Sequence, residues 1–253
     1  IGIWYYKDDD YSKAIEYYEK SLSIKQELND TRNIGKTLNN LGEVYFDMGD
    51  FTNSIEMFNQ SIEIKEKLKD TKGQVSSLFN RGKTFFFDQN YQSAINDFRL
   101  SSNLADFEPN TQKSNRFIGM AYFYLANHDS SALYLEESYE YYSEDPQRKL
   151  SVLPFLIISY SKLNDKENSM KYLEDFNQSI EEEDPHPDDY IMTNWMAYEA
   201  LKDGNYQDEA DEYLENAYLQ LKTESKNIKN KKDRNKFLKT KFHQKIVNTF
   251  KQS

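Results

Sequence analysis

Hydrophobic residues recur at spacings of three and four along paired segments of the chain. In one pair, the first apolar stripe consists of Leu38, Leu41, Tyr45 and Met48, and the second of Ile55, Phe58, Ile62 and Leu68. This spacing places apolar side chains on one face of an amphipathic helix. Gly49-Asp50 interrupts the pattern between the two stripes. The stretch therefore predicts two helices joined by a tight turn.

The same arrangement of small and aromatic residues occurs in three successive units. The matching sets are Gly2, Tyr5, Tyr11, Ala14, Tyr18 and Ser21; Gly42, Tyr45, Phe51, Ser54, Phe58 and Ser61; and Gly82, Phe85, Tyr91, Ala94, Phe98 and Ser101. Such self-similarity at a fixed period is typical of helical solenoids. Glycine inside a helix costs about 1 kcal/mol relative to alanine. We therefore expect a second helix to pass too close for a Cβ at Gly42 and Gly82, with Ser54 and Ala94 opposite.

The predicted units end at residues that stop or start helices. Asp30-Thr31 and Asp70-Thr71 supply side chains that can accept from the free N–H groups of a helix start. Four of the five prolines fall between units and Pro154 falls near a helix start, where proline is tolerated. Because Ile1 lies inside a predicted helix, we expect further sequence upstream. The pattern predicts a truncated first unit at 1–30, then units at 31–70, 71–108, 110–145, 146–184 and 187–222, and a basic C-terminal capping helix at 223–253.

The pattern resembles the tetratricopeptide repeat across residues 1–222, although Ile157 replaces the small mid-helix residue in a later unit. The run from Ile24 to Asp30, followed by Leu38 to Gly42, is similar to the 40-residue repeats of LGN-type adaptors and kinesin light chains. The resemblance implies an all-α, right-handed superhelical solenoid of about six helix-turn-helix repeats. The end of the chain is similar to a tail that closes repeat arrays in bacterial multidomain signalling proteins, at Ala217-Tyr218, Ile228, Arg234, Phe237-Leu238 and Ile246.

Charge is distributed unevenly along the chain. The net charge is −11. Residues 222–253 carry 11 Lys and Arg against Glu224 and Asp233, a net of +9, which leaves −20 on the remainder. An acidic body with a basic tail predicts an intramolecular contact or an acidic partner for the tail. We expect the tail to act first as a cap, then as a contact for an acidic neighbour, and only last as a nucleic-acid contact.

Several functional classes find no support in the sequence. The absence of cysteine excludes disulfides and thiolate chemistry. The three histidines are far apart, and neither HExxH nor a phosphate-binding glycine loop occurs. We interpret the acidic segment at 181–189 as a charged loop rather than a cation site, and the run Asp8–Asp10 as a solvated turn. We therefore predict a protein without catalytic activity, metal or cofactor, located in the cytoplasm and with no membrane partner.

In the family that the pattern resembles, the first helices of successive units line a concave groove that holds a peptide. Asparagine at the position of Asn40 and Asn80 reads the peptide backbone there, because an amide both donates and accepts hydrogen bonds. Lys83 and Arg116 are candidates to bind a ligand carboxylate. The residues predicted to face the groove are Lys36, Asn39, Asn40, Glu43, Asp47, Ser76, Phe79, Asn80, Lys83, Phe86, Phe87, Lys113, Arg116, Phe117, Met120, Phe123 and Tyr124.

The function that follows is a scaffold that binds a protein or peptide, as the interaction or regulatory module of a larger bacterial signalling protein. One alternative is a peptide-pheromone receptor module that controls a linked DNA-binding domain. Another is an accessory domain of a multidomain kinase or cyclase. The sequence leaves the partner and the oligomeric state open.

Overall fold

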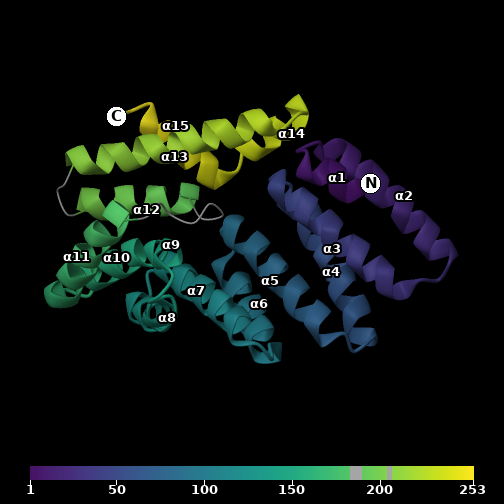
Figure 1. Cartoon of the computed structure of the whole chain (residues 1–253), viewed down its shortest axis with the longest axis horizontal. Coiled ribbons are helices and arrows are strands. Elements are labelled where there is room, and N and C mark those ends of the chain that lie inside the picture. Colours follow the sequence, from purple (N-terminus) through teal and green to yellow (C-terminus); the bar gives the residue numbers. More distant parts are fainter. Residues whose placement is uncertain (183–189, 204–206) are drawn as a thin grey trace. The chain divides into compact units, whose positions relative to one another are not determined.

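The computed structural model describes residues 1–182, 190–203 and 207–253, and within these ranges every regular element is an α-helix (Figure 1). This confirms the predicted all-α repeat fold. Of the acidic segment at 181–189, only residues 181 and 182, at the end of a helix, belong to the described residues. Among the described residues, no helix is long and apolar enough to cross a membrane.

The chain forms two compact units, each assembled from two segments. The first comprises residues 1–111 and 223–244, and the second comprises residues 112–222 and 245–253. The helices that lie wholly within the first unit are α1 (Gly2–Lys7), α2 (Tyr11–Glu27), α3 (Thr31–Asp47), α4 (Phe51–Lys67), α5 (Thr71–Phe87), α6 (Tyr91–Leu104) and α14 (Lys231–Leu238). The others are α7 (Glu108–Tyr124), α8 (His128–Tyr141), α9 (Pro146–Leu150), α10 (Leu153–Lys162), α11 (Lys166–Glu182), α12 (Tyr190–Asp203), α13 (Gln207–Asn227) and α15 (Lys241–Phe250).

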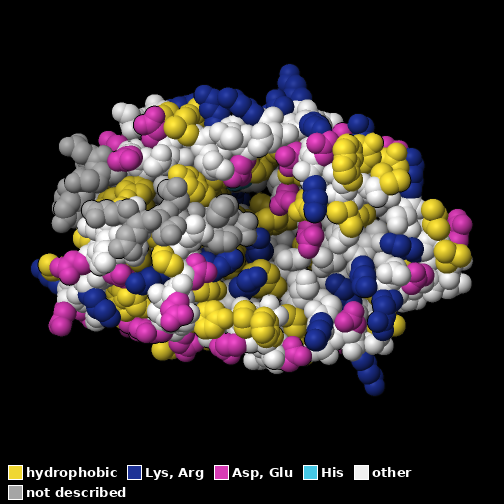
Figure 2. All heavy atoms as spheres, viewed as in Figure 1, with side chains coloured by type: hydrophobic (Ala, Val, Ile, Leu, Met, Phe, Trp, Pro, Cys, Tyr) yellow, Lys and Arg dark blue, Asp and Glu magenta, His cyan; other side chains and the backbone are white. Residues whose placement is uncertain are grey.

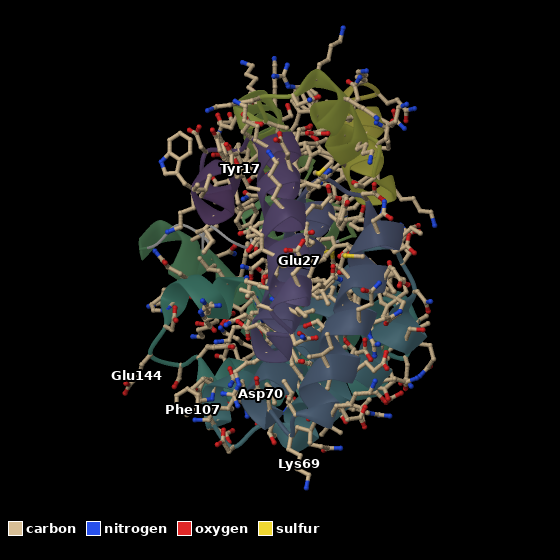
Figure 3. All side chains as sticks on the ribbon, turned by 90° about the vertical axis from the view of Figure 1, so that its right-hand side faces the viewer. Tyr17, Glu27, Lys69, Asp70, Phe107 and Glu144 are labelled. Carbon is tan, nitrogen blue, oxygen red and sulfur yellow. The ribbon has the colours of Figure 1, made fainter. Side chains whose placement is uncertain are left out.

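Within the first unit, each helix packs against the next one along the chain, and α3 also contacts α5. The turns between these helices share one geometry. A residue with positive φ stands at positions 9, 29, 49, 69 and 89, and the helix cap follows it directly. Lys69 and Asp70, which form one of these turns, are labelled in Figure 3. Asp30 and Asp70 accept the predicted capping bonds, from the backbone N–H groups of Asn33 and Gly73.

The mid-helix glycines allow the close approach of a ring on the next helix. A Cβ at Gly42 would lie 2.7 Å from the ring of Phe58, and one at Gly82 would lie 2.8 Å from that of Phe98. The predicted small residue opposite Gly42 is also in place, because the Ser54 hydroxyl donates to the Gly42 carbonyl at 2.9 Å. At Gly42 the close approach therefore has two components, a ring against the glycine and a small hydroxyl against its carbonyl.

The second unit has a broken inner helix where the sequence predicts a single one. Helix α9 ends at Leu150, and α10 begins at Leu153 with Pro154 at its start, as predicted. Helix α10 packs against α8, α11 and α12. Ile157, which stands where earlier units have a small residue, is buried in this unit.

The C-terminal tail forms two helices, α14 and α15, rather than one capping helix. The break has a local cause, because the Asn230 and Thr240 side chains each accept a backbone N–H at a helix start. Phe237 lies in the first unit, on the apolar cluster built around Tyr11 and Met48. Phe250 instead stacks on Tyr218 in the second unit, with ring centroids 4.1 Å apart.

The expected contact between the basic tail and the acidic body is present in the first unit. Lys229 pairs with Asp8, and Lys236 pairs with Asp50. Asp10 caps α2 by accepting the backbone N–H of Lys13. The predicted turn at Asp8–Asp10 is confirmed, but its side chains are only partly exposed, since the turn also contacts the tail and caps a helix. In Figure 2, Lys and Arg side chains gather over the C-terminal helices.

Candidate functional site

The predicted groove residues divide between the two units and differ in exposure. In the first unit, α3 and α5 carry them from Lys36 to Phe87; in the second, α7 carries them from Lys113 to Tyr124. Lys36, Ser76 and Lys113 are exposed, whereas Asn40, Glu43, Asp47, Phe79, Asn80, Lys83, Phe87, Phe123 and Tyr124 are partly buried. Asn39, Phe86, Arg116, Phe117 and Met120 are buried, which leaves their side chains little or no surface for a ligand.

Glu43 is the centre of a polar network that joins α3 to α5. One of its carboxylate oxygens accepts from the Asn39 amide at 2.9 Å and from the Asn80 amide at 2.8 Å. Burial raises the pKa of the Glu43 carboxyl, and these two amides together with Lys83 oppose that rise. The asparagine of one repeat is therefore held by the acid of the preceding repeat.

The network continues beneath the face formed by α3 and α5, toward α4. The Ser77 hydroxyl donates to the Asn39 amide oxygen at 2.6 Å, and the Lys65 ammonium donates to Ser77 at 2.6 Å. Lys65 is buried, and its pKa falls to about 8 because burial disfavours the charged form. Lys25 makes the equivalent bond to Thr37 at 2.5 Å one repeat earlier. This buried support fixes Asn39 and, through it, the orientation of Glu43.

Asp47 lies one helical turn beyond Glu43 and adds a second carboxylate to the same face. It accepts a hydrogen bond of 2.6 Å from the Tyr6 hydroxyl of α1. Burial raises the pKa of Asp47 to about 6, against the opposing effects of Tyr6 and Lys83. The Lys83 ammonium lies 5.0 Å from the centroid of the Phe46 ring. The face therefore combines two perturbed carboxylates with one cation.

Asn40 and Asn80 occupy the same position in successive repeats but have different partners. The Asn40 side chain lies near the Tyr18 hydroxyl and lowers the pKa of that group, against the larger rise caused by burial. The preceding repeat offers Asn40 no carboxylate at the position of Glu43, because Ile3 stands there. Among the described residues, the amide oxygen of Asn80 accepts no hydrogen bond.

Aromatic side chains border the polar face. The Phe87 ring is 5.5 Å from that of Phe46 and 6.1 Å from that of Phe242 in the C-terminal tail. Phe79 contacts Phe98 at 5.5 Å and so belongs in part to the packing of α5 on α6. Of the consecutive aromatics at 85–87, Phe86 is buried while its two neighbours keep partial exposure.

In the second unit, the residues of α7 take part mainly in packing. The buried Arg116 guanidinium donates to the Ser151 hydroxyl at 2.6 Å, in the break between α9 and α10. Phe123 packs edge-on against Phe155 at 5.2 Å, and the Tyr124 hydroxyl contacts the Met196 sulfur at 3.4 Å. These contacts give α7 a structural role that its sequence position alone does not reveal.

Sequence reasoning missed three residues that shape the face in the first unit, namely Tyr6, Lys65 and Ser77. Lys65 carried a usable signal, since Lys25 stands 40 residues earlier and Thr37 and Ser77 supply hydroxyls at matching positions. Tyr6 carried none, because its partner Asp47 is on a helix from the next repeat. Within the described part of the chain, no group of three His, Cys, Asp or Glu residues is arranged to hold a metal ion.

Comparison with known families identifies the repeats. A tetratricopeptide-repeat model matches residues 33–106, and a second tetratricopeptide-repeat model matches residues 1–32. Both models describe a structural repeat rather than a catalytic domain. A search of curated proteins finds no match.

Solved structures share the fold at low sequence identity. The apo form of RapI is 14% identical with a TM-score of 0.75, covering 98% of this chain and 96% of that one. The Rap conjugation gene regulator of the plasmid pLS20, in complex with the Phr* peptide, is 15% identical with a TM-score of 0.60, covering 99% and 73%. A putative kinesin light chain of Podosopora anserina is 14% identical with a TM-score of 0.59, covering 71% and 91%.

These likenesses agree with the helix pairs seen in the described residues. The chain therefore carries tetratricopeptide repeats, which the two family models match over residues 1–32 and 33–106.

Proposed function

We propose that this protein is a non-catalytic module that binds a peptide segment of a partner on the face formed by α3 and α5. The observation that carries the proposal is the convergence of Asn39 and Asn80 on Glu43, which joins two repeats. Asn39 is buried and supports the acid, whereas Glu43 and Asn80 are partly exposed. Arrays of helical repeats present extended surfaces of this kind for binding. The face belongs entirely to the first compact unit.

The chemistry of the face suits a peptide backbone flanked by charged side chains. Asn80 offers an amide oxygen that accepts no hydrogen bond from the described residues, and Asn40 offers a second amide 40 residues earlier. An extended backbone presents donors and acceptors in alternation, so an amide can bind it independently of its side chains. Lys83 supplies a cation that can bind a peptide carboxylate.

The two perturbed carboxylates favour a ligand with a positive charge. Burial raises the pKa of both Glu43 and Asp47, which means that their ionised forms lack full compensation within the protein. A peptide ammonium or basic side chain placed beside them would supply that compensation. We therefore expect peptides with a basic residue near the position of Asp47 to bind best.

A small signalling peptide is a second candidate ligand, favoured by one comparison. The pLS20 conjugation regulator, whose fold this chain shares, is in complex with the Phr* peptide. A free peptide could bind the same polar side chains as a segment of a partner protein. A role as the regulatory part of a larger signalling protein, through a linked DNA-binding, kinase or cyclase domain, extends this proposal.

The test uses a phage-displayed library of random decapeptides selected on the wild-type protein. The variant Asn40→Ala/Asn80→Ala removes both amides, and Asn96→Ala/Asn103→Ala is the matched control because both residues are exposed on the outer helix α6. We expect selected peptides to bind at least tenfold more weakly to the first variant and equally well to the control, with unchanged circular dichroism. Equal affinity for both variants would refute the role of the asparagines, and a library without binders would refute the function.

A further inference from the structure

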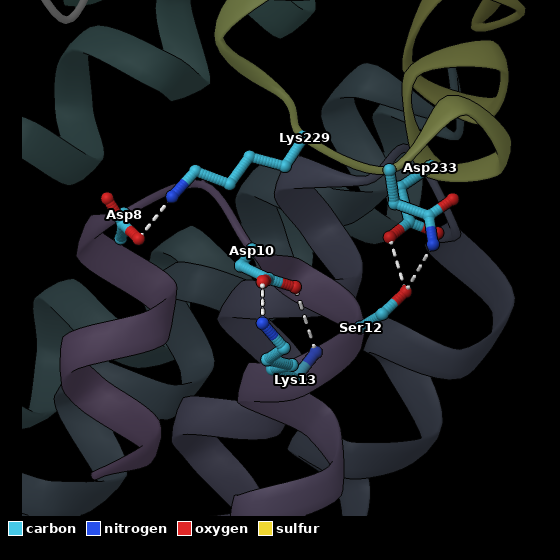
Figure 4. Close-up of polar contacts among 7 residues, drawn as sticks. Asp8, Asp10, Ser12, Lys13, Lys229 and Asp233 are labelled. Carbon is cyan, nitrogen blue, oxygen red and sulfur yellow. Dashed lines mark hydrogen bonds and ion pairs between the residues drawn. The ribbon is translucent and has the colours of Figure 1, made fainter.

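The C-terminal tail lies on two turns of the first unit that are far from it in sequence. Figure 4 shows its contacts with the first of these turns. We call residues 228–243 the docking segment, and the turns at residues 8–12 and 48–50 the turn surface. The Ser12 hydroxyl donates to Asp233 at 2.8 Å and accepts from the Asn230 amide at 3.1 Å. The backbone N–H of Lys229 donates to the carbonyl of Asp9 at 3.2 Å.

The contact is complementary in charge. Lys229 pairs with Asp8 and Lys236 with Asp50, so each turn binds one lysine of the docking segment. Between the two lysines, Asp233 is buried and bonded to Ser12. The tail from residue 222 onward carries a net charge of +9 against −20 for the remainder, so the attraction also acts at long range.

The apolar part of the contact involves three residues of the docking segment. Ile228 is buried in the cluster formed by α2 and α3, Phe237 packs partly on it, and Phe242 meets Phe87. The helix pairs of the repeats instead bury whole rings, such as Phe58 and Phe98. Because local opening follows the interface with the fewest buried apolar contacts, the docking segment should leave before the repeats unfold.

The sequence of one turn is adapted to this contact. Positive φ occurs at positions 9, 29, 49, 69 and 89, yet glycine stands only at position 49, where the docking segment passes. A Cβ at Gly49 would lie 2.6 Å from the Thr240 methyl and 3.2 Å from the Lys236 carbonyl oxygen. The other four turns accommodate a side chain at the same φ. Glycine at position 49 is therefore required by the tail rather than by the turn.

We propose that the turn surface is a docking site for a basic segment that contains a short helix, that the docking segment occupies it within the chain, and that this occupant leaves while the repeats remain folded. The occupant has two lysines seven residues apart, one for each turn, and an aromatic residue directly after the second. Its departure uncovers acidic turns next to an apolar patch, and it frees Phe87 at the border of the α3 and α5 face.

The first experiment measures amide hydrogen exchange of the full chain as salt is raised. Two partly exposed ion pairs together change an opening equilibrium by about tenfold, so Lys229→Glu/Lys236→Glu should raise exchange of residues 228–243 by about that factor or more. The matched control is Lys231→Glu/Lys239→Glu, because both lysines are exposed and form no ion pair with the described residues. Exchange across α3–α6 should not change in either variant.

A second pair of variants leaves the charge of the docking segment untouched. Gly49→Asn keeps a residue that tolerates positive φ but places a Cβ against Thr240, whereas Lys69→Asn makes the equivalent change in a turn without the docking segment. We expect Gly49→Asn to raise exchange of residues 228–243 by about tenfold and Lys69→Asn to leave it unchanged. The fluorescein-labelled synthetic peptide of residues 226–246 should bind the Lys229→Glu/Lys236→Glu variant and not the wild type.

The outcomes separate an exchangeable helix from a permanent cap. Loss of protection across 228–243 and α3–α6 together would show one cooperative structure and overturn the proposal. Unchanged protection in both the charge-reversal variant and Gly49→Asn would also overturn it. If the labelled peptide fails to bind the opened variant, the turn surface is not a docking site.

Discussion

Replacing Gly42 by alanine tests whether the repeats depend on the close approach of a ring to a glycine. In wild type, a Cβ at this position would lie 2.7, 2.8 and 2.9 Å from three atoms of the Phe58 ring, which is buried in the core. Overpacking of this kind costs about 1–3 kcal/mol. Alanine regains about 1 kcal/mol of helix propensity. The net expectation is a destabilisation of about 1 kcal/mol.

Gly35→Ala is the matched control on the same helix. Its Cβ would meet the Ile64 methyl at 3.1 Å, and Ile64 is only partly buried, so that side chain has room to shift. The gain in helix propensity should then dominate, giving a change between zero and about 1 kcal/mol of stabilisation. The two alanines should therefore differ by about 1–2 kcal/mol although the chemical change is identical.

The assay is urea unfolding followed by circular dichroism, with hydrogen exchange across α3 and α4 to locate the change. Exchange is needed because repeat arrays unfold in parts when neighbouring units are weakly coupled. The double variant Gly42→Ala/Phe58→Leu should recover part of the loss, since a smaller side chain makes room for the methyl. If Gly42→Ala is as stable as Gly35→Ala, the steric explanation for the repeated glycine is refuted.

Two further predictions concern charged residues of the first unit. Because the pKa of Asp47 is raised from 3.8 to about 6, the folded protein binds this proton more tightly than the unfolded chain, and wild-type stability falls as pH rises through that window. Asp47→Asn should therefore stabilise by about 3 kcal/mol at pH 7.5 and by nothing at pH 3.5, as measured by urea unfolding. An equal effect at both pH values would contradict this. Arg81 binds the buried Asp97 through two hydrogen bonds of 2.6 and 2.7 Å. Arg81→Lys should lower the free energy of unfolding by about 1 kcal/mol. Arg81→Met leaves the carboxylate unpaired and should lower it by about 3 kcal/mol. Equal losses in thermal unfolding would show that the paired geometry contributes nothing.

The repeat fold was predictable because its signals are local and recur. Gly42 with Gly82, and Asp30 with Asp70, mark helix packing and helix starts at positions that the chain repeats. The break between α9 and α10 was not predictable, because Pro154 is equally compatible with the start of an uninterrupted unit. The tail divides into two helices at the capping bond of Thr240. That position was not recognisable in the sequence, because the lysines around it are compatible with a continuous helix.

The candidate face was predictable only in outline. Its helices and the asparagine position follow from the repeat register, but the partners of Asn40 and Asn80 do not. Glu43 binds Asn80 because an acid precedes it by one repeat, and Asn40 lacks such an acid because Ile3 stands there. Whether Phe86 or Phe87 faces outward depends on the packing of α5 against its neighbours, which a helical spacing of three and four leaves undecided.

The shared geometry of the turns has a consequence for how such a chain changes length. The dipeptide Asp-Thr opens α3 at residues 30–31 and α5 at residues 70–71, after a residue with positive φ in both cases. Deletion of residues 31–70 would join Asp30 to Thr71 and recreate an identical helix start. The array can therefore lose or gain a unit by recombination at this junction without any new local structure. Gly49 would leave with the deleted unit, so such an event would retain the repeats and remove half of the surface that the tail occupies.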